Sequence, residues 1–420
     1  MSTVEASAPA ASNSLAQTSL VPRFRKQGYD DESVKGRRSW IEKQTGVKLT
    51  HVGSHSVPSE LMRGNVENPI GTVQVPVGVA GPLLIHGTHA RGIFYVPLAT
   101  TEGALVRSYE RGMVTLTRAG GVTTRISMDE NRTSPVFLFA DVDAAHDFAA
   151  ELSQHFPRVK REVESTTAHG KLLRLECRQV GREVIVSFCY FTADAHGMNM
   201  IVKATERGCQ WILQHSAAQD FYLFSGMASE KHGSGSLLPG GKGKKVIAGA
   251  TLSADLLKTY LRLTPAKLVD FWHHTITGHM QANTIGYNGH YANGLAALFI
   301  ACGQDVANIV NSAIGMTNFE LAGEDKVYVS VTLPSLTVAT VGGGTGLGTS
   351  RECLGMLGAA GGGGAPKLAE IAAATLLAGE ISIAGAIASG EFVKAHDDYG
   401  RNRPEIQKHV VRSDMNQSVP

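Results

Sequence analysis

The sequence predicts a mixed α+β fold in which a small α/β unit is inserted into a larger, helix-rich domain. Three observations support this prediction. Residues 67–83 alternate Val, Ile, Gly and Pro, as strands joined by tight turns do. Residues 121–222 place apolar strands on both sides of a helical segment. After a loop that is rich in Gly, Ser and Lys, the chain becomes rich in Ala and Gly, which predicts closely packed helices.

The composition excludes several classes of protein. A chain of 420 residues can form two or three domains with a large core. The 39 basic and 37 acidic residues leave a net charge of +2, which gives no support for nucleic-acid binding or attachment to an anionic membrane. The five cysteines are scattered and include no CxxC pair, so we expect reduced thiols in a cytoplasmic protein and no metal site.

The ends of the chain and its most apolar stretch predict further features. Residues 1–20 are rich in Ala and Ser and lack the regions of a signal peptide, so we expect a disordered leader. Residues 29–60 predict a short helical region. Residues 371–390 are interrupted by Glu380 and Ser382, so we expect them to fall short of the ~20 apolar residues of a membrane span.

The segment VPLATTEGALV, residues 96–106, holds one carboxylate in a nearly apolar run, that of Glu102. Taken alone, the segment is typical of a helix start. Thr100 or Thr101 would cap a helix that runs through Leu105, and an acid in the first turn would offset the helix dipole. A catalytic acid is the alternative, and the segment by itself favours the helix start.

Three further segments place polar groups beside apolar elements. The Gly-rich residues 341–350 suggest backbone amides turned toward a pyrophosphate, although a flexible turn is equally consistent, and they match neither GxGxxG nor the P-loop. Asp305 follows an apolar helix that ends at Gly303, and it could simply cap the next helix. Asp194 and Asn199 flank a tight turn after an apolar strand.

Two isolated residues complete the set of candidates. Lys231 lies in the Gly/Ser/Lys-rich loop, and His396 lies in the polar C-terminal tail, where a mobile segment could carry a gating residue. Each would be an ordinary solvent-exposed side chain by default. A function is indicated only by the combination of these segments.

In combination, the segments closely resemble the 3-hydroxy-3-methylglutaryl-coenzyme A (HMG-CoA) reductase family. The matching blocks occur in the family's order between about Glu67 and Arg401: ENPIG with PVGVAGPL, VPLATTEGALV, DAHGMNMI, GYNGHYANGLAALFIACGQD, TVGGGTGLGT and FVKAH. DAHGMNM and GGGTGLGT are more similar to the class I enzymes of eukaryotes and archaea than to class II. Nothing in the sequence resembles the family's membrane anchor, so the resemblance is to a soluble class I-like form.

The resemblance implies a large domain around a long central helix and an inserted ferredoxin-like domain that binds the dinucleotide. A domain that is not of the Rossmann type agrees with the missing GxGxxG pattern. The implied divisions are a leader (1–20), a helical N-terminal region (21–66), a catalytic and CoA-binding domain (67–124 and 223–403), the inserted NADP-binding domain (125–222) and a tail (404–420). Family members share active sites between subunits, so a homodimer or homotetramer is expected.

The implied reaction is the reduction of HMG-CoA to mevalonate and CoA with two NADPH, a step of isoprenoid biosynthesis; NADH is the alternative cofactor. Lys231 would stabilise the oxyanion formed at the first reduction. Glu102, with Asp305 as its neighbour, would supply a proton at the second reduction. His396 would protonate the departing CoA thiolate, on a tail that opens and closes in each cycle.

Binding roles are also implied by the resemblance. The hydroxymethylglutaryl group would be held by Arg125, Ser225 and Asn293, and the CoA phosphates by Arg111. The nicotinamide would be bordered by Asp194, Met198 and Asn199, and the rest of the dinucleotide by Gly343, Gly344 and Thr345. Class I enzymes often hold the 2′-phosphate with an arginine, but Ala168 occupies that position here, which leaves Lys171 and Arg401 as candidates.

The chain departs from the family at several positions. The catalytic loop reads Glu230, Lys231, His232 in place of aspartate-lysine-lysine, and His274 replaces a lysine. Both changes weaken the positive field expected around the substrate. Asn402 replaces the serine at which animal members are phosphorylated. Two rival functions are an NAD-dependent enzyme that degrades mevalonate and a non-catalytic relative that binds acyl-CoA.

Overall fold

The computed structural model describes residues 20–24 and 28–393, and the chain divides into two compact units after Gln74. Almost all of the predicted leader lies outside the described residues. So do the predicted tail and two candidate site residues, His396 and Arg401.

The first unit is helical where it is described, as the sequence predicts. Its elements are α1 (Asp31–Thr45), α2 (Thr50–Gly53) and the 3₁₀ helix η3 (Ser59–Met62). Asp30 caps α1 by accepting a hydrogen bond from the Ser33 amide, and this bond lowers the pKa of Asp30. The buried Arg37 guanidinium donates to the carbonyl oxygens of Gly28 and Pro69. One side chain of α1 thus binds a segment that precedes the helix and a segment that follows it.

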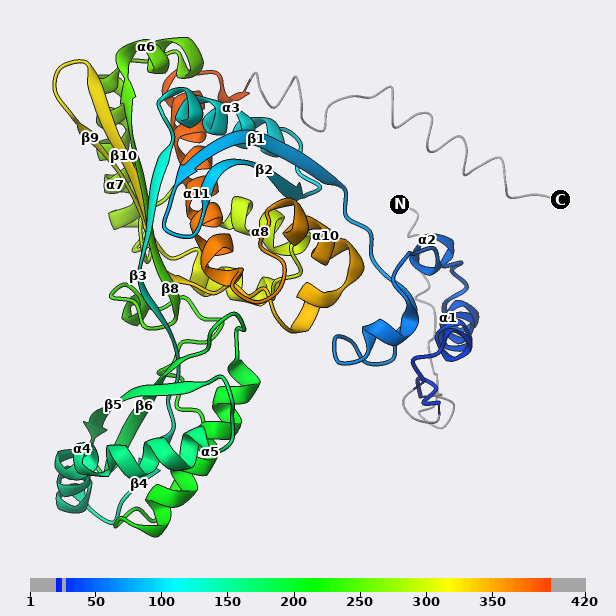
Figure 1. Cartoon of the computed structure of the whole chain (residues 1–420), viewed down its shortest axis with the longest axis vertical. Helices are drawn as coiled ribbons and strands as arrows, with labels where there is room; N and C mark the ends of the chain where they lie inside the picture. The colour runs from blue at the N-terminus through cyan, green and yellow to red at the C-terminus, as the bar shows by residue number, and fades with distance from the viewer. Residues whose placement is uncertain (1–19, 25–27, 394–420) are drawn as a thin grey trace, which may run out of the picture. The chain divides into compact units, whose positions relative to one another are not determined.

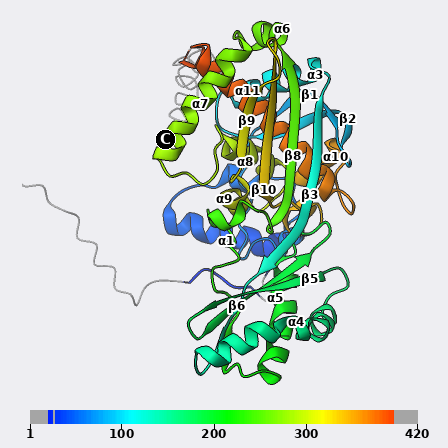
Figure 2. The ribbon, with the colours of Figure 1, turned by 90° about the vertical axis from the view of Figure 1, so that its left-hand side faces the viewer.

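The second unit is built around the apolar helix α11 (Ala365–Ala388), which packs on a mainly antiparallel sheet. Figure 2 shows β3, β8, β10 and β9 side by side in that order, and β1 pairs with both β2 and β3. The strands of this part are β1 (Val77–His86), β2 (Arg91–Ala99), β3 (Val122–Thr133), β8 (Gly243–Ser253), β9 (Met316–Leu321) and β10 (Lys326–Leu336). The helices are α3 (Leu105–Arg118), α6 (Ala254–Leu256), α7 (Pro265–Gln281), α8 (Tyr291–Ala301), α9 (Ile309–Ser312) and α10 (Gly348–Met356).

The C-terminal half is less helical than the sequence predicts, because β8, β9 and β10 belong to it. The residues of β10 alternate between buried and exposed positions over most of the strand. Ala and Gly in β8 obscure the same alternation, since these residues are typical of helices and turns. The general Ala/Gly richness of this half therefore concealed three strands.

The predicted insertion forms a layer of two helices on its own strands (Figure 1). Its elements, in chain order, are β4 (Val136–Leu138), α4 (Val142–Glu164), β5 (Lys171–Val180), β6 (Glu183–Phe191), α5 (Met198–Gln214) and β7 (Asp220–Tyr222). The strands pair antiparallel in the order β7-β4-β6-β5. Strand β3 pairs with β8 along most of its length and with β6 at its end, so it joins both parts.

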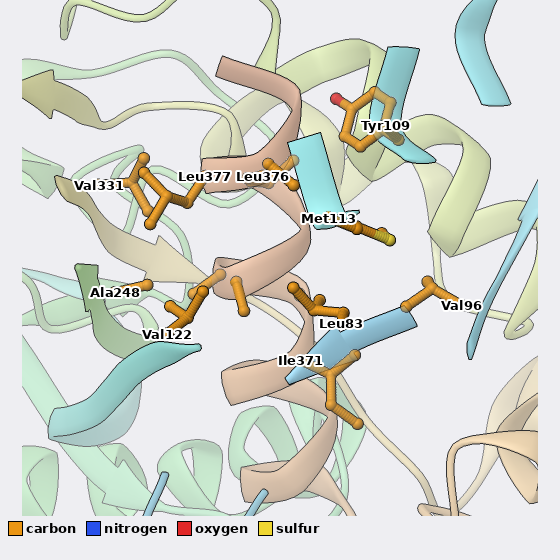
Figure 3. Packing of buried hydrophobic residues seen from close by; sticks show 14 of the residues in the cluster. Leu83, Val96, Tyr109, Met113, Val122, Ala248, Val331, Ile371, Leu376 and Leu377 are labelled. Carbon is orange, nitrogen blue, oxygen red and sulfur yellow. The ribbon is translucent and has the colours of Figure 1, made fainter. Parts of the chain in front are cut away.

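Helix α11 is long and apolar enough to cross a membrane by length and composition, contrary to the prediction for residues 371–390. However, 83% of its apolar window is buried inside the protein. Figure 3 shows side chains from the sheet and from α3 around Ile371, Leu376 and Leu377 of α11. Among them are Leu83 of β1, Val96 of β2, Val331 of β10 and Met113 of α3. The helix therefore forms the core of this unit, as a central helix is expected to do.

Candidate active site

Glu102 lies before helix α3 and outside its first turn. The helix begins at Leu105 after Ala104, whose φ of 68° is in the left-handed region, and no side chain caps it. Thr100 accepts a hydrogen bond from the Glu102 amide instead of capping the helix. The interpretation of Glu102 as a dipole-offsetting acid is therefore wrong, and its exposed carboxylate is available to a ligand.

The Glu102 carboxylate faces an amide from α8. Asn293 Nδ2 donates to Glu102 Oε1 at 3.3 Å, which brings together two residues that lie far apart in the sequence. Both residues line a cavity of about 240 Å³ between the start of α3, the start of α8 and the end of α11. His290 also lines this cavity, and its buried Nε2 has no hydrogen-bond partner among the described residues. The cavity thus combines apolar walls with a few polar groups.

Arg111 lines the same cavity. Its Nε and Nη2 donate to the side-chain and backbone oxygens of Ser382 at 3.1 and 2.7 Å. Burial lowers the pKa of Arg111, while the nearby Glu391 opposes this effect. The guanidinium is therefore held in place by the end of α11.

Lys231 and Asp305 form an ion pair, with 2.8 Å between Nζ and Oδ2 and both side chains about half exposed. Asp305 has a second role, because its Oδ1 accepts a hydrogen bond from the Ala307 amide and so caps the 3₁₀ helix η6 (Val306–Asn308). The capping role suggested by the sequence is confirmed, and it leaves the other oxygen for Lys231. Lys231 itself has a φ of 57°, in the left-handed region.

The Gly-rich segment adjoins this ion pair. Gly303 and Gly344 lie backbone to backbone, since a Cβ on Gly303 would come within 2.4 Å of the Gly344 carbonyl oxygen. The 3₁₀ helix η7 (Gly343–Gly346) follows, and the Thr345 hydroxyl is buried and donates to the Gly342 carbonyl. A Cβ on Gly342, Gly343 or Gly346 would meet no atom within 4 Å, so these glycines leave an open surface.

Glu230, next to Lys231, turns toward the protein interior. It pairs with Lys242, which is completely buried, and with His196 Nε2 at 3.3 Å. Burial raises the pKa of Glu230, but the hydrogen bond from His196 and the charge of Lys242 outweigh it and hold the pKa at about 2. Burial lowers the pKa of Lys242, and Glu230 opposes that shift. Glu230 thus anchors the loop that carries Lys231.

Arg125, the arginine predicted to bind the substrate, is not among the residues that line the cavity around Glu102. Arg125 is exposed in the middle of β3, where it donates to the carbonyl oxygens of His86 and Thr124. Seven residues farther along the strand, about 23 Å away, Arg132 is 6% exposed, and the Lys242 Nζ donates to its carbonyl oxygen.

The Arg132 side chain is partly unsatisfied. It reaches Ser236, and its Nε has no hydrogen-bond partner among the described residues. The sequence reasoning missed Arg132, although its place in NRTSP, where a polar segment enters an apolar strand, was a usable signal. Ser225 donates to the carbonyl oxygen of Ser134, close along the chain to Arg132.

The remaining candidates lie where the insertion meets the large sheet. Asp194 accepts hydrogen bonds from the Gly363 and Ala365 amides, so its carboxylate binds the start of α11. Met198 begins α5, with its Sδ 3.6 Å from Lys242 Nζ, and Asn199 is exposed beside it. Lys171 lies 4.0 Å from the Glu164 carboxylate, which offsets its charge.

Helix α8 separates the two groups of catalytic candidates. Asn293, which contacts Glu102, is in its first turn, and Asp305, which contacts Lys231, follows its C-terminal end. Its 11 residues make a helix about 16 Å long. Within the part of the chain that the structure describes, no hydrogen bond or ion pair joins Glu102 to Lys231 or Asp305. The two groups therefore lie at opposite ends of α8 within one chain.

The five cysteines, all of them among the described residues, are free. Among the described residues, no group of His, Cys, Asp and Glu could hold a metal ion. His274, on α7, is largely exposed and pairs with Asp270 at 3.4 Å.

Comparisons with known proteins show the family of the chain. The family model described as hydroxymethylglutaryl-coenzyme A reductase matches residues 33–401. A 3-hydroxy-3-methylglutaryl-coenzyme A reductase of Methanothermobacter thermautotrophicus is 42% identical, over 88% of this chain and 94% of its own. The enzyme of the same name from Aeropyrum pernix is 41% identical, over 94% of this chain and 95% of its own.

A solved structure supports the same fold. The class II 3-hydroxy-3-methylglutaryl-CoA reductase from Streptococcus pneumoniae, bound to NADPH in open conformations, superposes with a TM-score of 0.66. It is 18% identical, and the match covers 84% of this chain and 97% of that one. From the family model, the two archaeal relatives and the shared fold, the chain belongs to the hydroxymethylglutaryl-coenzyme A reductase family.

Proposed function

We propose that this protein reduces HMG-CoA to mevalonate and free CoA, with NADPH as the reductant. The observation that carries the proposal is the ion pair of Lys231 with Asp305 beside an open Gly-rich surface. The cavity around Glu102 and Arg111 supplies the second half of the site. Reduction of a thioester to an alcohol takes two hydrides and two protons and releases one thiol.

Lys231 stabilises the negative charge that develops on the thioester carbonyl oxygen. Its ammonium group is fixed by Asp305, and the loop behind it is anchored by Glu230 and Lys242. A cation that is already oriented needs no reorganisation when the charge forms, and one such group typically lowers the barrier by about 3 kcal/mol or more. Arg132, whose buried Nε has no partner among the described residues, is the arginine we assign to the substrate in place of Arg125.

Glu102 delivers the proton to the oxygen that becomes the mevalonate hydroxyl. The Asn293 amide orients its carboxyl group toward the cavity. Arg111, at the other side of the cavity, suits the phosphates of CoA. Protonation of the departing thiolate is assigned to His396, which lies outside the described residues.

The cofactor site fits the region around the Gly-rich segment. Bound NADPH would supply the hydride for each reduction. The glycines at 342, 343 and 346 leave room for a dinucleotide, since no atom lies within 4 Å of a Cβ built on them. Met198 and Asn199 start a helix beside Lys242, and Asp194 fixes the neighbouring loop. Lys171, offset by Glu164, is the weaker candidate for the 2′-phosphate, and Arg401 is the other.

The domain divisions are part of the proposal. The element order βαββαβ and the strand order β7-β4-β6-β5 support a ferredoxin-like cofactor domain over residues 125–222. The central position of α11 supports a catalytic and CoA-binding domain over residues 67–124 and 223–403. The scattered free cysteines support a cytoplasmic protein.

We also propose that the working enzyme is a homodimer or a dimer of dimers. The Glu102 half-site and the Lys231 half-site lie at opposite ends of α8, so a complete site requires halves from two subunits. A mixture of subunits tests this arrangement directly. Co-expression of Glu102→Gln and Lys231→Met chains would restore about a quarter of wild-type activity in dimers that form at random. Activity no greater than that of the single variants would rule out shared sites.

One assay tests the reaction itself. Purified protein is mixed with HMG-CoA and either NADPH or NADH, and cofactor oxidation and free thiol are followed together. Two cofactors oxidised per thiol, faster with NADPH, is the expected result. Tight binding of HMG-CoA without oxidation would favour a non-catalytic relative, and faster oxidation of mevalonate with NAD would favour a degradative enzyme.

A further inference from the structure

Helix α11 carries two buried glutamates, Glu370 and Glu380, which are 0% and 2% exposed. Each carboxylate accepts three hydrogen bonds from outside its own helix. Glu370 binds the amides of residues 88–90, in the turn between β1 and β2. Glu380 binds the amides of Gly289 and His290 at 2.7 and 2.8 Å and the Thr317 hydroxyl at 2.7 Å.

Glu380 holds the two residues that lead into α8, Gly289 and His290, through their backbone amides. His290 precedes the helix and provides no side-chain cap. The first amides of a helix have no partners within the helix, so an acceptor from elsewhere stabilises the helix start. Asn288 Oδ1 accepts from the first amide of α8, that of Tyr291, at 3.2 Å, and Glu380 accepts from the two amides before it. The two side chains together therefore fix where α8 begins, and that of Glu380 ties this start to α11.

The start of α8 is also a wall of the cavity. His290 and Asn293 line it, and Asn293 contacts Glu102. Tyr109, on α3, packs against the His290 ring with 5.2 Å between the ring centroids. The hydroxyl end of the Tyr109 ring lies between α8 and α11, where Gly294 and Gly379 leave space. A Cβ on either glycine would come within 2.5 Å of Tyr109 atoms. Three helices thus meet at fixed positions beside Glu102.

We propose that Glu380 is a positioning residue of the active site. Through the start of α8 it holds Asn293 against Glu102, and so it sets the direction in which Glu102 delivers its proton. This inference rests on the proposed function of Glu102. It assigns to a core residue, which contacts no substrate, an effect on the rate of reduction.

The matched variants Glu380→Gln and Glu370→Gln test the proposal. Each replaces one buried carboxylate on the same helix by an amide of the same size, and each weakens a set of three hydrogen bonds. We expect both variants to lose thermal stability. Below both transitions, kcat for HMG-CoA reduction should fall about 100-fold in Glu380→Gln, since a displacement of about 1 Å can cost that factor. The KM for HMG-CoA should change less than threefold, and Glu370→Gln should keep wild-type kcat.

A double-mutant cycle separates positioning from general stability. Because Glu380 acts through Asn293, the double variant Glu380→Gln/Asn293→Ala should lose no more kcat than the more damaging single change. Additive losses, or equal losses in Glu370→Gln and Glu380→Gln, would overturn the proposal. Thr317→Val, which removes one of the three donors, replaces Glu380→Gln if that variant does not fold, and it should lower kcat about threefold to tenfold. A wild-type protein without reductase activity would instead refute the proposed function.

Discussion

The two half-sites hold their carboxylates in opposite ways. Glu102 contacts a neutral amide at the edge of a partly apolar cavity, whereas Asp305 contacts the Lys231 ammonium and a helix amide. Glu102 therefore keeps a free oxygen for a proton and a ligand, while both oxygens of Asp305 have partners. The comparison teaches that the carboxylate at one end of α8 is left open to a ligand, whereas the carboxylate at the other end is fixed by a cation and a helix amide.

The largest effect should come from removing the fixed charge. Lys231→Met should lower kcat by about 100-fold to 1,000-fold, because the oxyanion loses its stabilising cation. HMG-CoA binding, followed by calorimetry, should change far less. Lys267→Met, which changes a half-exposed lysine on α7 that pairs with Asp270, is the control and should remain active. If Lys231→Met kept more than a tenth of wild-type kcat, the assignment of the charged half-site would fail.

Replacement of Glu102 should cause the next largest loss of activity. Glu102→Gln should lower mevalonate formation by about 100-fold, a typical loss for one general acid. Glu110→Gln, which changes a partly buried acid on α3 that pairs with Arg107, should have little effect. Substrate affinity, measured by fluorescence quenching or calorimetry, should remain near that of the wild type. Loss of binding instead would mean that Glu102 holds the substrate or the backbone and does not transfer a proton.

The free energy of unfolding should depend on pH through Glu230, which anchors the loop of Lys231. Its pKa is depressed to about 2 in the folded protein, below the usual value of 4.5. The stability it contributes is present above pH 4.5 and is lost as the pH falls toward 2. Urea unfolding between pH 6 and 3 should therefore show a steeper loss for the wild type than for Glu230→Gln/Lys242→Met. The double change avoids leaving Lys242 buried and unpaired. Parallel pH curves would contradict the depressed pKa.

The smallest effect should separate the two roles of Asp305. Asp305→Asn can still cap η6 but loses the ion pair, so we expect about a tenfold loss of kcat at unchanged stability. Asp305→Ala should lose, in addition, about 1 kcal/mol of the free energy of unfolding. Chemical denaturation and steady-state assays on the two variants measure both quantities. Equal stability of Asn and Ala at this position would show that the cap contributes nothing.

Local patterns predicted the elements whose signals lie within one short segment. The helix at Leu105, the insertion with α4 and β6, and the capping role of Asp305 all follow from neighbouring residues. The three strands of the C-terminal half did not, because Ala and Gly occupy both helices and strands where backbones approach closely. The helix-dipole role suggested for Glu102 failed because Ala104 delays the helix start.

The site residues that sequence reasoning missed act through tertiary contacts. Glu230 was noted only as a departure from the family in the catalytic loop, and the fold brings it to Lys242 and His196. Glu380 was noted as an interruption in an apolar stretch, and its three donors come from other elements. Arg125 and Arg132 lie on one strand, and only burial distinguishes them. Such roles depend on distances across the fold, which no sequence spacing records.

The close packing of α11 limits how this chain can change over time. Nineteen of its 24 residues are buried, and a Cβ on Gly112 of α3 would come within 1.9 Å of the Ala378 carbonyl oxygen. Neighbouring backbones therefore leave no room for larger side chains, whereas α4 exposes several charged positions. Substitutions that alter surface charge or solubility can accumulate on α4. On α11, in contrast, only side chains of similar size and polarity can replace those present.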